Sequence, residues 1–202
     1  MPWWCAVAAS SSLVAFGGSR SLPSSAASLV ASVVCACLRG GRSVSVGCAA
    51  GADALVLSSA LAVPGGAARL SVFAVGASSG AGFWSGSALP AVRAALAAGA
   101  RVLWLAGGAL SVPLRARLLL RSRAALVGAS AFVLFLASPS SPGSLSVAGF
   151  AVSAGLPVFA FSFGFVGAPL APRRCAGAWV PASLAGSACW RWVPAASQPS
   201  LF

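Results

Sequence analysis

The sequence lacks histidine, glutamate, lysine and tyrosine, and Asp53 is the single acidic residue among its 202 residues. Without histidine or a second carboxylate, the chain cannot build a Ser/His/Asp triad, a paired-carboxylate hydrolase site, an EF-hand or a His-ligated metal site. The 13 basic residues are all arginines and give a formal net charge of +12, which favours a polyanionic partner. The length fits one domain, or one domain with a tail.

The set of residue types is unusually small. Except for Met1, Asp53 and Gln198, every residue is Ala, Cys, Phe, Gly, Leu, Pro, Arg, Ser, Val or Trp. These are the amino acids that the standard genetic code can write without adenine, so we infer that the gene is nearly free of adenine. The mean hydropathy of +0.95 is then a poor guide to membrane residence, because few polar residues were available. Asp53 and Gln198 retain an adenine against this bias, which indicates that the protein needs them.

A long uncharged segment, residues 124–172, raises the question of a membrane span. Its densest apolar run, residues 131–137, is much shorter than the about 20 residues of a transmembrane helix and is followed by Ser, Pro and Gly. The N-terminus lacks the basic start of a secretory signal. We therefore expect no membrane span and a cytoplasmic protein.

The cysteines contain no CxxC pair, and they are Cys5, Cys35, Cys37, Cys48, Cys175 and Cys189. A zinc site built from Cys35, Cys37, Cys175 and Cys189 would have a spacing unlike the usual ligand patterns. Cysteine is also one of the few small apolar residues that this sequence uses. We therefore favour buried free thiols and expect no metal.

Apolar runs typical of strands alternate with Ala/Leu/Arg-rich segments typical of helices. This alternation predicts an α/β fold, a doubly wound, mostly parallel, Rossmann-like sheet with right-handed connections, over residues 1–162. Residues 163–202 are rich in Pro, Gly and Trp, and we expect an irregular tail that packs partly on the domain. The expected strands are 12–16, 43–46, 70–75, 101–105, 131–136 and 157–161. The expected helices are 24–38, 51–61, 88–98, 113–127 and 144–154.

Three motifs occur in a characteristic order: FGGSRSLP at 16–23, VGCAAGADALV at 46–56, and residues 121–161, which begin RSRAALVG and end LPVFAF. Together they resemble the SLOG superfamily, the Rossmann-like group that includes the DNA-processing protein DprA and the LOG phosphoribohydrolases. The resemblance spans about residues 12–162 and implies a site for a nucleotide or for nucleic-acid phosphate. LOG enzymes would carry a catalytic Glu in a PGGxGTxxE turn, whereas this chain has SPSSPGSLSVAG at 138–149. We therefore do not expect N-glycoside hydrolysis of that kind.

The glycine-rich turns of these motifs follow expected strands, at the sheet edge where open α/β folds bind ligands. Glycine lets backbone N–H groups approach a phosphate at a helix start, and Arg20 with Arg121 or Arg123 would add cationic groups. Asp53 could cap a helix, bind a ribose hydroxyl or pair with Arg20. The alternative is that the glycines only form tight turns. The candidate ligand-binding residues are Gly17, Gly18, Ser19, Arg20, Gly47, Cys48, Ala49, Gly51, Asp53, Arg121, Arg123, Ser141, Gly143 and Ser144.

The chain ends in QPSLF, which resembles the pentapeptide by which bacterial proteins bind the replication sliding clamp. Such a peptide places two adjacent apolar side chains, here Leu201 and Phe202, in a preformed pocket, while the amide of Gln198 makes hydrogen bonds at the pocket edge. The nearby Trp190 and Trp192 could stack on bases or pack on the domain, and we favour packing.

The expected function is therefore that of a non-enzymatic, SLOG-type protein that binds a nucleotide or DNA phosphate. Its C-terminal peptide would recruit it to the sliding clamp in DNA processing, replication or repair. One alternative is a nucleotide-processing enzyme that uses Asp53 and Arg20. Another is a nucleotide sensor whose ligand changes its oligomeric state. We expect a homo-oligomer, and no cofactor other than a nucleotide.

Overall fold

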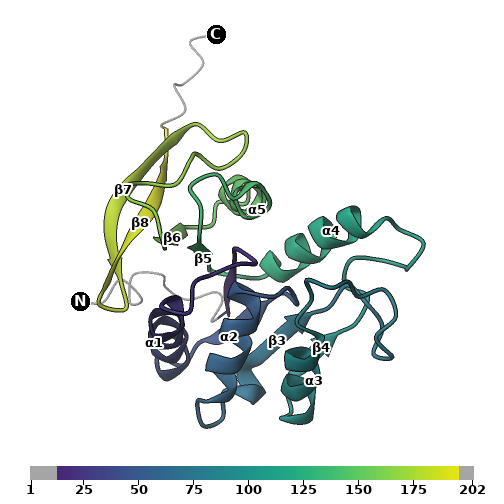
Figure 1. Cartoon of the computed structure of the whole chain (residues 1–202). Coiled ribbons are helices and arrows are strands. Elements are labelled where there is room, and N and C mark those ends of the chain that lie inside the picture. The colour runs from purple at the N-terminus through teal and green to yellow at the C-terminus, as the bar shows by residue number, and fades with distance from the viewer. Residues whose placement is uncertain (1–12, 196–202) are drawn as a thin grey trace.

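The computed structural model describes residues 13–195, which form one eight-stranded sheet flanked by helices (Figure 1). The strand order is β4-β3-β2-β1-β5-β6-β8-β7, and every pairing among β1 to β6 is parallel. The predicted doubly wound, mostly parallel α/β fold is confirmed. The strands are β1 (Leu13–Gly18), β2 (Ser43–Val46), β3 (Leu70–Phe73), β4 (Arg101–Leu103), β5 (Ala131–Leu136), β6 (Val158–Ser162), β7 (Gly177–Leu184) and β8 (Ser187–Pro194).

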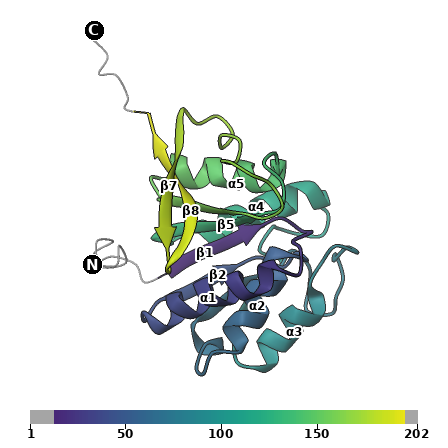
Figure 2. The same ribbon diagram turned by 60° about the vertical axis from the view of Figure 1, so that its left-hand side comes forward.

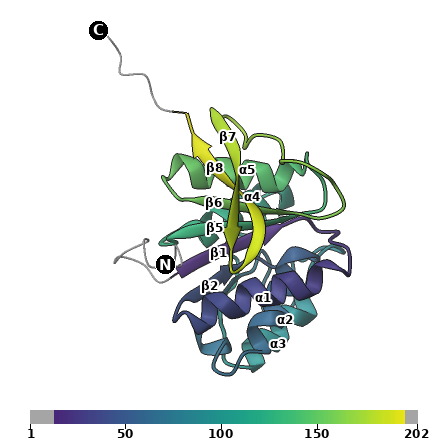
Figure 3. The ribbon, with the colours of Figure 1, turned by 90° about the vertical axis from the view of Figure 1, so that its left-hand side faces the viewer.

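Helices cover both faces of the parallel part of the sheet. Helices α1 to α3 pack side by side on one face, whereas α4 and α5 lie on the other (Figures 2 and 3). The helices are α1 (Ala26–Arg39), α2 (Ala52–Leu61), α3 (Leu89–Ala97), α4 (Leu114–Leu126) and α5 (Pro142–Ser153), and a 3-10 turn spans Ala67–Arg69.

The central strand β5 shows why the sheet needs helices on both faces. Its sequence AFVLFL is buried at every position. Successive side chains of a strand point to opposite faces, so Val133 and Phe135 join the core under α1 and α2, while Phe132 and Leu134 join the core under α5. A strand buried on both faces is a near-continuous apolar run, which is the pattern seen in the sequence.

The connection between β4 and β5 changes the direction in which the sheet grows. The chain runs outward from β1 to β4, and α4 then returns it to β5 on the other side of β1. The carboxyl ends of β1 and β5 therefore form the topological switch point, where open α/β sheets bind ligands.

The C-terminal region corrects one expectation, because part of the predicted irregular tail is a β-hairpin. β7 and β8 pair antiparallel with each other, and β8 pairs antiparallel with β6. The two residues between them, Ala185 and Gly186, have φ of 53° and 78°, as a tight hairpin turn requires. Trp192 is 3% exposed and its ring contacts Trp179 edge to face at 5.3 Å. The packing interpretation of Trp192 is confirmed, and its burial provides the apolar anchor that holds the hairpin on the sheet.

The described cysteines are free thiols, and Cys37, Cys48 and Cys189 are buried while Cys35 and Cys175 are half-buried. Burial raises the pKa of Cys37 to about 12 and that of Cys189 to about 11, so both stay protonated and pack as small apolar groups. Within residues 13–195, no group of three or more His, Cys, Asp or Glu side chains could hold a metal ion. In the same residues, the longest and most apolar helix falls short of what a membrane crossing requires.

Candidate phosphate-binding site

A cavity of about 620 Å³ opens at the switch point, between the ends of β1 and β5 and the facing parts of α4 and α5. The loop after β2 closes it from the side of α2. The structure thus brings together most of the residues that the three motifs predicted. Those that line the cavity are Gly17, Gly18, Ser19, Arg20, Gly47, Ala49, Asp53, Arg121, Ser141, Gly143 and Ser144.

An ion pair forms part of the cavity wall. Arg121, on α4, donates from Nη1 to Oδ2 of Asp53 at 3.0 Å, and the N–H of Ala49 donates to the same oxygen at 3.0 Å. Asp53 is 5% exposed and Arg121 is 7% exposed, so each charge depends on the other for compensation. The partner of Asp53 is therefore Arg121 rather than Arg20. Asp53 lies in the first turn of α2, but its side chain does not cap the helix.

Gly47 makes room for this ion pair. A Cβ atom at Gly47 would lie 1.2 Å from Nη1 of Arg121 and 2.4 Å from Oδ2 of Asp53. Any side chain here would therefore displace the guanidinium group from the carboxylate. The sequence placed Gly47 in a phosphate-binding turn, and the structure shows that its first effect is to let Arg121 reach Asp53.

Ser19 joins the loops that follow β1 and β5. Its hydroxyl oxygen accepts the N–H of Ala137 at 2.9 Å and lies 2.8 Å from the hydroxyl oxygen of Ser141. Its own N–H donates to the carbonyl of Phe135, and its carbonyl accepts the N–H of Ala52 at 3.0 Å. The wall between β1, β5 and α2 is thus held by directional bonds before any ligand arrives.

The start of α5 lines the cavity, and because its first residue is Pro142, the N–H groups of Gly143 and Ser144 are the backbone donors of this turn. Ser141 precedes the helix and makes no side-chain capping bond, and Ser141, Gly143 and Ser144 all line the cavity. A Cβ at Gly143 would meet nothing within 4 Å, so the backbone here is open to a ligand. A helix start carries free N–H groups and the positive end of the helix dipole. The start of α2 is different, because it already donates from Ala52 to Ser19 and carries Asp53.

Three exposed arginines add positive charge to the lining of the cavity. Arg20 comes from the loop after β1, Arg115 from the first turn of α4, and Arg173 from the segment before β7. The sequence had indicated only Arg20. Arg115 has no motif around it, and Arg173 lies in the region interpreted as a tail. Because Asp53 is paired with Arg121, the cavity carries a net positive charge that suits a phosphate.

The inner wall of the cavity is apolar. Phe132 and Leu134 of β5 contribute to it, as do Leu118 and Leu126 of α4 and Val147 of α5. A cavity with a cationic mouth and an apolar interior suits a ligand that joins a phosphate to a less polar body.

Three predicted residues do not line the cavity. Cys48 is buried beneath it, and that burial raises the pKa of its thiol. The guanidinium group of Arg123 lies over the ring of Phe150 at 3.8 Å and links α4 to α5. Gly51, with φ of 73°, allows α2 to approach the loop after β1, because a Cβ would lie 2.4 Å from the carbonyl of Arg20. These three residues therefore contribute to the structure around the cavity without lining it.

Comparisons with protein-family models, with curated proteins and with solved structures find no match for this chain. The resemblance of the three motifs to the SLOG superfamily therefore stays a prediction from the sequence. The residues predicted to bind the sliding clamp, Gln198, Leu201 and Phe202, lie outside the described residues.

Proposed function

We propose that this protein binds the phosphate group of a nucleotide or nucleic acid in the cavity at the ends of β1 and β5. The observation that carries the proposal is that Arg20, Arg115 and Arg173 line the same cavity as the start of α5. The sole acid of the chain is already compensated by Arg121, so nothing at the cavity repels an anion. Free backbone donors combined with guanidinium groups are the usual protein receptor for phosphate.

The proposed role is binding rather than catalysis. A general base must reach the proton it removes, and Asp53 uses Oδ2 to hold both Ala49 and Arg121. The chain has no histidine or glutamate to replace it. In the alternative, a nucleotide-processing enzyme, Asp53 would have to act as the base through its other oxygen or after leaving this pair.

The test compares nucleoside monophosphates with the corresponding nucleosides in calorimetric titrations of the full chain. We expect the monophosphates to bind and the nucleosides to bind far more weakly. Replacing Arg20, Arg115 or Arg173 by Ala should each weaken monophosphate binding about 10- to 150-fold, the loss of one charge-assisted hydrogen bond. The matched control is Arg93→Ala, because Arg93 is exposed on α3 and bonds to the carbonyl of Ser79 away from the cavity.

An equal loss of affinity in the Arg93→Ala variant would show that only net charge matters and would overturn the site. Incubation of the same nucleotides, followed by chromatography, tests the enzyme alternative. Turnover that disappears in Asp53→Asn would favour an enzyme. Sedimentation with and without nucleotide tests the alternative of a sensor that changes its oligomeric state, and the expected homo-oligomer with it.

We further propose that QPSLF recruits the protein to the bacterial sliding clamp, which would place it in DNA processing, replication or repair. The support is in the sequence: Gln198 is the only glutamine, and it stands at fixed distance before the terminal Leu201 and Phe202. The intact chain should bind a purified clamp with micromolar affinity, and the chain lacking residues 198–202 should not. Absence of binding by the intact chain at high concentration would contradict this proposal.

A further inference from the structure

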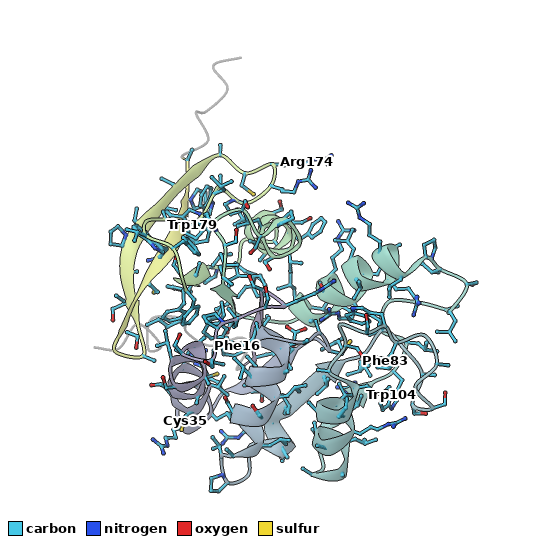
Figure 4. The ribbon with its side chains drawn as sticks, in the orientation of Figure 1. Phe16, Cys35, Phe83, Trp104, Arg174 and Trp179 are labelled. Carbon is cyan, nitrogen blue, oxygen red and sulfur yellow. The ribbon has the colours of Figure 1, made fainter. Side chains whose placement is uncertain are left out.

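The cavity is elongated, because it follows one face of α4 for most of the helix. Its lining residues on α4 recur at short intervals along this face: Arg115, Leu118, Leu119, Arg121, Ser122, Ala125 and Leu126. From Arg115 to Leu126 the helix rises about 16 Å. On α5 the lining residues lie within 142–147. Both helices lie on the face of the sheet opposite to α1, which carries Cys35 (Figures 1 and 4). The cavity is therefore a groove between two helices, and we call it the α4–α5 groove.

The two ends of the α4–α5 groove differ in chemistry. Both helices come after parallel strands and so begin at the carboxyl edge of the sheet, where Arg20 and Arg115 line the groove. The other end is lined from the last turns of α4, from α5 and from the first half of β5, by Ala125, Leu126, Val147 and Phe132. The groove thus passes from a cationic end to an apolar end.

The apolar end is bounded by the sheet and by a contact between the two helices. Phe132, on β5, is 3% exposed and belongs to the core under α5. The guanidinium carbon of Arg123 lies 3.8 Å from the ring centroid of Phe150, a cation–π contact that joins α4 to α5. Phe150 comes one helical turn after Val147, the last lining residue of α5. A ligand therefore enters from the cationic end.

So much space between two helices is unusual in a folded protein. Protein interiors are packed about as densely as organic crystals, whereas the α4–α5 groove has a volume of about 620 Å³. Apolar cavities hold water poorly and bind apolar molecules of suitable size. The apolar end of the groove therefore suits an apolar part of a ligand.

The apolar end has few groups that could form hydrogen bonds with a nucleobase. Its polar side chains are Ser122 and Ser146, and the hydroxyl of Ser122 already donates to the carbonyl of Leu118 at 2.9 Å. The strands below, β1 and β5, have a hydrogen-bonded neighbour on each side, which occupies their backbone groups. Burying the polar edge of a base without partners is costly, whereas an alkyl chain has no polar edge. The groove therefore favours an alkyl chain.

We propose that the α4–α5 groove binds a single-chain phosphate monoester of an apolar alcohol. The phosphate lies at the cationic end, near Arg20, Arg115 and the start of α5, and the chain extends past Ser122 toward Phe132. This inference rests on the phosphate site of the proposed function. It goes beyond that function in the rest of the ligand, which is an alkyl chain in place of a nucleoside.

The experiment is a calorimetric titration of the full chain with butyl, hexyl and octyl phosphate. The affinity should rise about three- to fourfold for each methylene that enters the groove, as the transfer free energy of a methylene predicts. Octanol, which lacks the phosphate, should bind far more weakly than octyl phosphate. Nucleoside monophosphates should also bind more weakly than octyl phosphate.

Ser122→Phe places a ring midway along the groove. This variant should bind butyl phosphate as the unaltered chain does, but it should lose most of the gain in affinity from butyl to octyl phosphate. Ser122→Leu adds a smaller side chain and should lose part of the gain. The matched control is Ser58→Phe, which should keep the whole gain. Ser58 is exposed on α2, and its hydroxyl also donates to a carbonyl of its own helix, that of Leu55 at 3.0 Å.

Equal affinity for butyl and octyl phosphate would overturn the alkyl chain as the occupant and leave the phosphate site standing. Binding of none of the phosphates would overturn both proposals. Octanol binding as tight as that of octyl phosphate would overturn the ligand class, because the phosphate would then contribute nothing. Tighter binding of a nucleoside monophosphate would show that the groove takes a base. Cosedimentation with phosphatidic acid vesicles that Ser122→Phe leaves unchanged would place the phosphate contact at a membrane surface and overturn the groove.

Discussion

Two buried arginines on α4, one helical turn apart, have very different environments. Arg117 is 6% exposed and donates from Nε to Val112 at 2.9 Å, and from Nη1 to Val75 at 2.9 Å and Gly82 at 3.0 Å. Arg121 is 7% exposed, bonds only to Asp53 through Nη1 at 3.0 Å, and its Nε is buried without a partner among the described residues. Arg117 lies outside the cavity lining and Arg121 is part of it.

The difference separates a structural cation from a cation held at the cavity that we propose as a binding site. The guanidinium group of Arg117 donates hydrogen bonds to backbone carbonyls, and these bonds connect α4 to the loop that carries Phe83. Arg121 has a guanidinium nitrogen, Nε, that makes no hydrogen bond to the described residues. Its charge is balanced by Asp53, the only acidic side chain of the sequence. Buried donors are nearly always satisfied. Among the described residues, the buried side-chain donors without a partner are Nε of Arg121 and Nε1 of Trp84 and Trp192, and of these residues only Arg121 lines the cavity, which supports a ligand site there.

The largest effect is expected from removing the counter-charge of Arg121. Asp53→Ala leaves a buried guanidinium group unpaired, which typically costs about 3–5 kcal/mol of unfolding free energy. Urea denaturation measures the loss. The double variant Asp53→Ala, Arg121→Leu should recover most of it, because it removes the stranded charge. A loss below about 1 kcal/mol in the single variant would show that Arg121 finds compensation elsewhere.

Replacing the structural arginine should affect stability alone. Arg117→Met keeps an apolar stem but leaves the carbonyls of Val75, Gly82 and Val112 without this donor, which we expect to cost about 3 kcal/mol in total. Thermal unfolding measures this loss, and titration with a nucleoside monophosphate should show unchanged affinity. Weaker monophosphate binding with intact folding would abolish the distinction between the two arginines.

Two glycines of the cavity should respond in opposite ways to the same substitution. Gly47→Ala forces the ion pair apart and should lower stability by about 1–3 kcal/mol, as overpacking does, and weaken phosphate binding. Gly143→Ala meets open space in the first turn of α5 and should stabilise the helix by about 0.5–1 kcal/mol. Urea denaturation of both variants measures the two changes in unfolding free energy. Similar losses of stability in both would show that the lack of space for a Cβ at Gly47 does not explain its effect.

The parallel part of the fold could be predicted because its rules are local. β2 and β5 occupy the predicted ranges 43–46 and 131–136. A short strand-forming segment that is bounded by glycine or serine and followed by a helical segment is compatible with few structures other than a parallel strand. The glycine-rich turns identified the edge of the sheet that carries the cavity for the same reason, because parallel strands bring their carboxyl ends to one side of the sheet.

The contacts that complete the site could not be predicted, because they join distant residues. Asp53 and Arg121 are 68 positions apart, and the sequence had suggested Arg20 as the partner of Asp53. Arg173 lines the cavity from the segment before β7, where its N–H donates to the carbonyl of Leu145 on α5 at 3.2 Å. The turn of the hairpin that follows, Ala185 and Gly186, lacks the asparagine or aspartate that usually marks such a turn. Composition therefore suggested an irregular tail where cross-strand packing of Trp179 and Trp192 forms a hairpin.

The smallest expected effect is a change in monophosphate affinity in Asp53→Asn, and the direction of that change distinguishes two roles of Asp53. Asp53→Asn keeps an oxygen that accepts the N–H of Ala49 but removes the charge that balances Arg121. If Arg121 contributes to anion binding, the affinity for a nucleoside monophosphate should rise about two- to fivefold at low salt, and the gain should shrink as salt screens it. Arg117→Met, titrated under the same conditions, should show no such gain. If Asp53 instead bonds to a ribose hydroxyl, the affinity falls at every salt concentration, and the carboxylate belongs to the ligand rather than to Arg121.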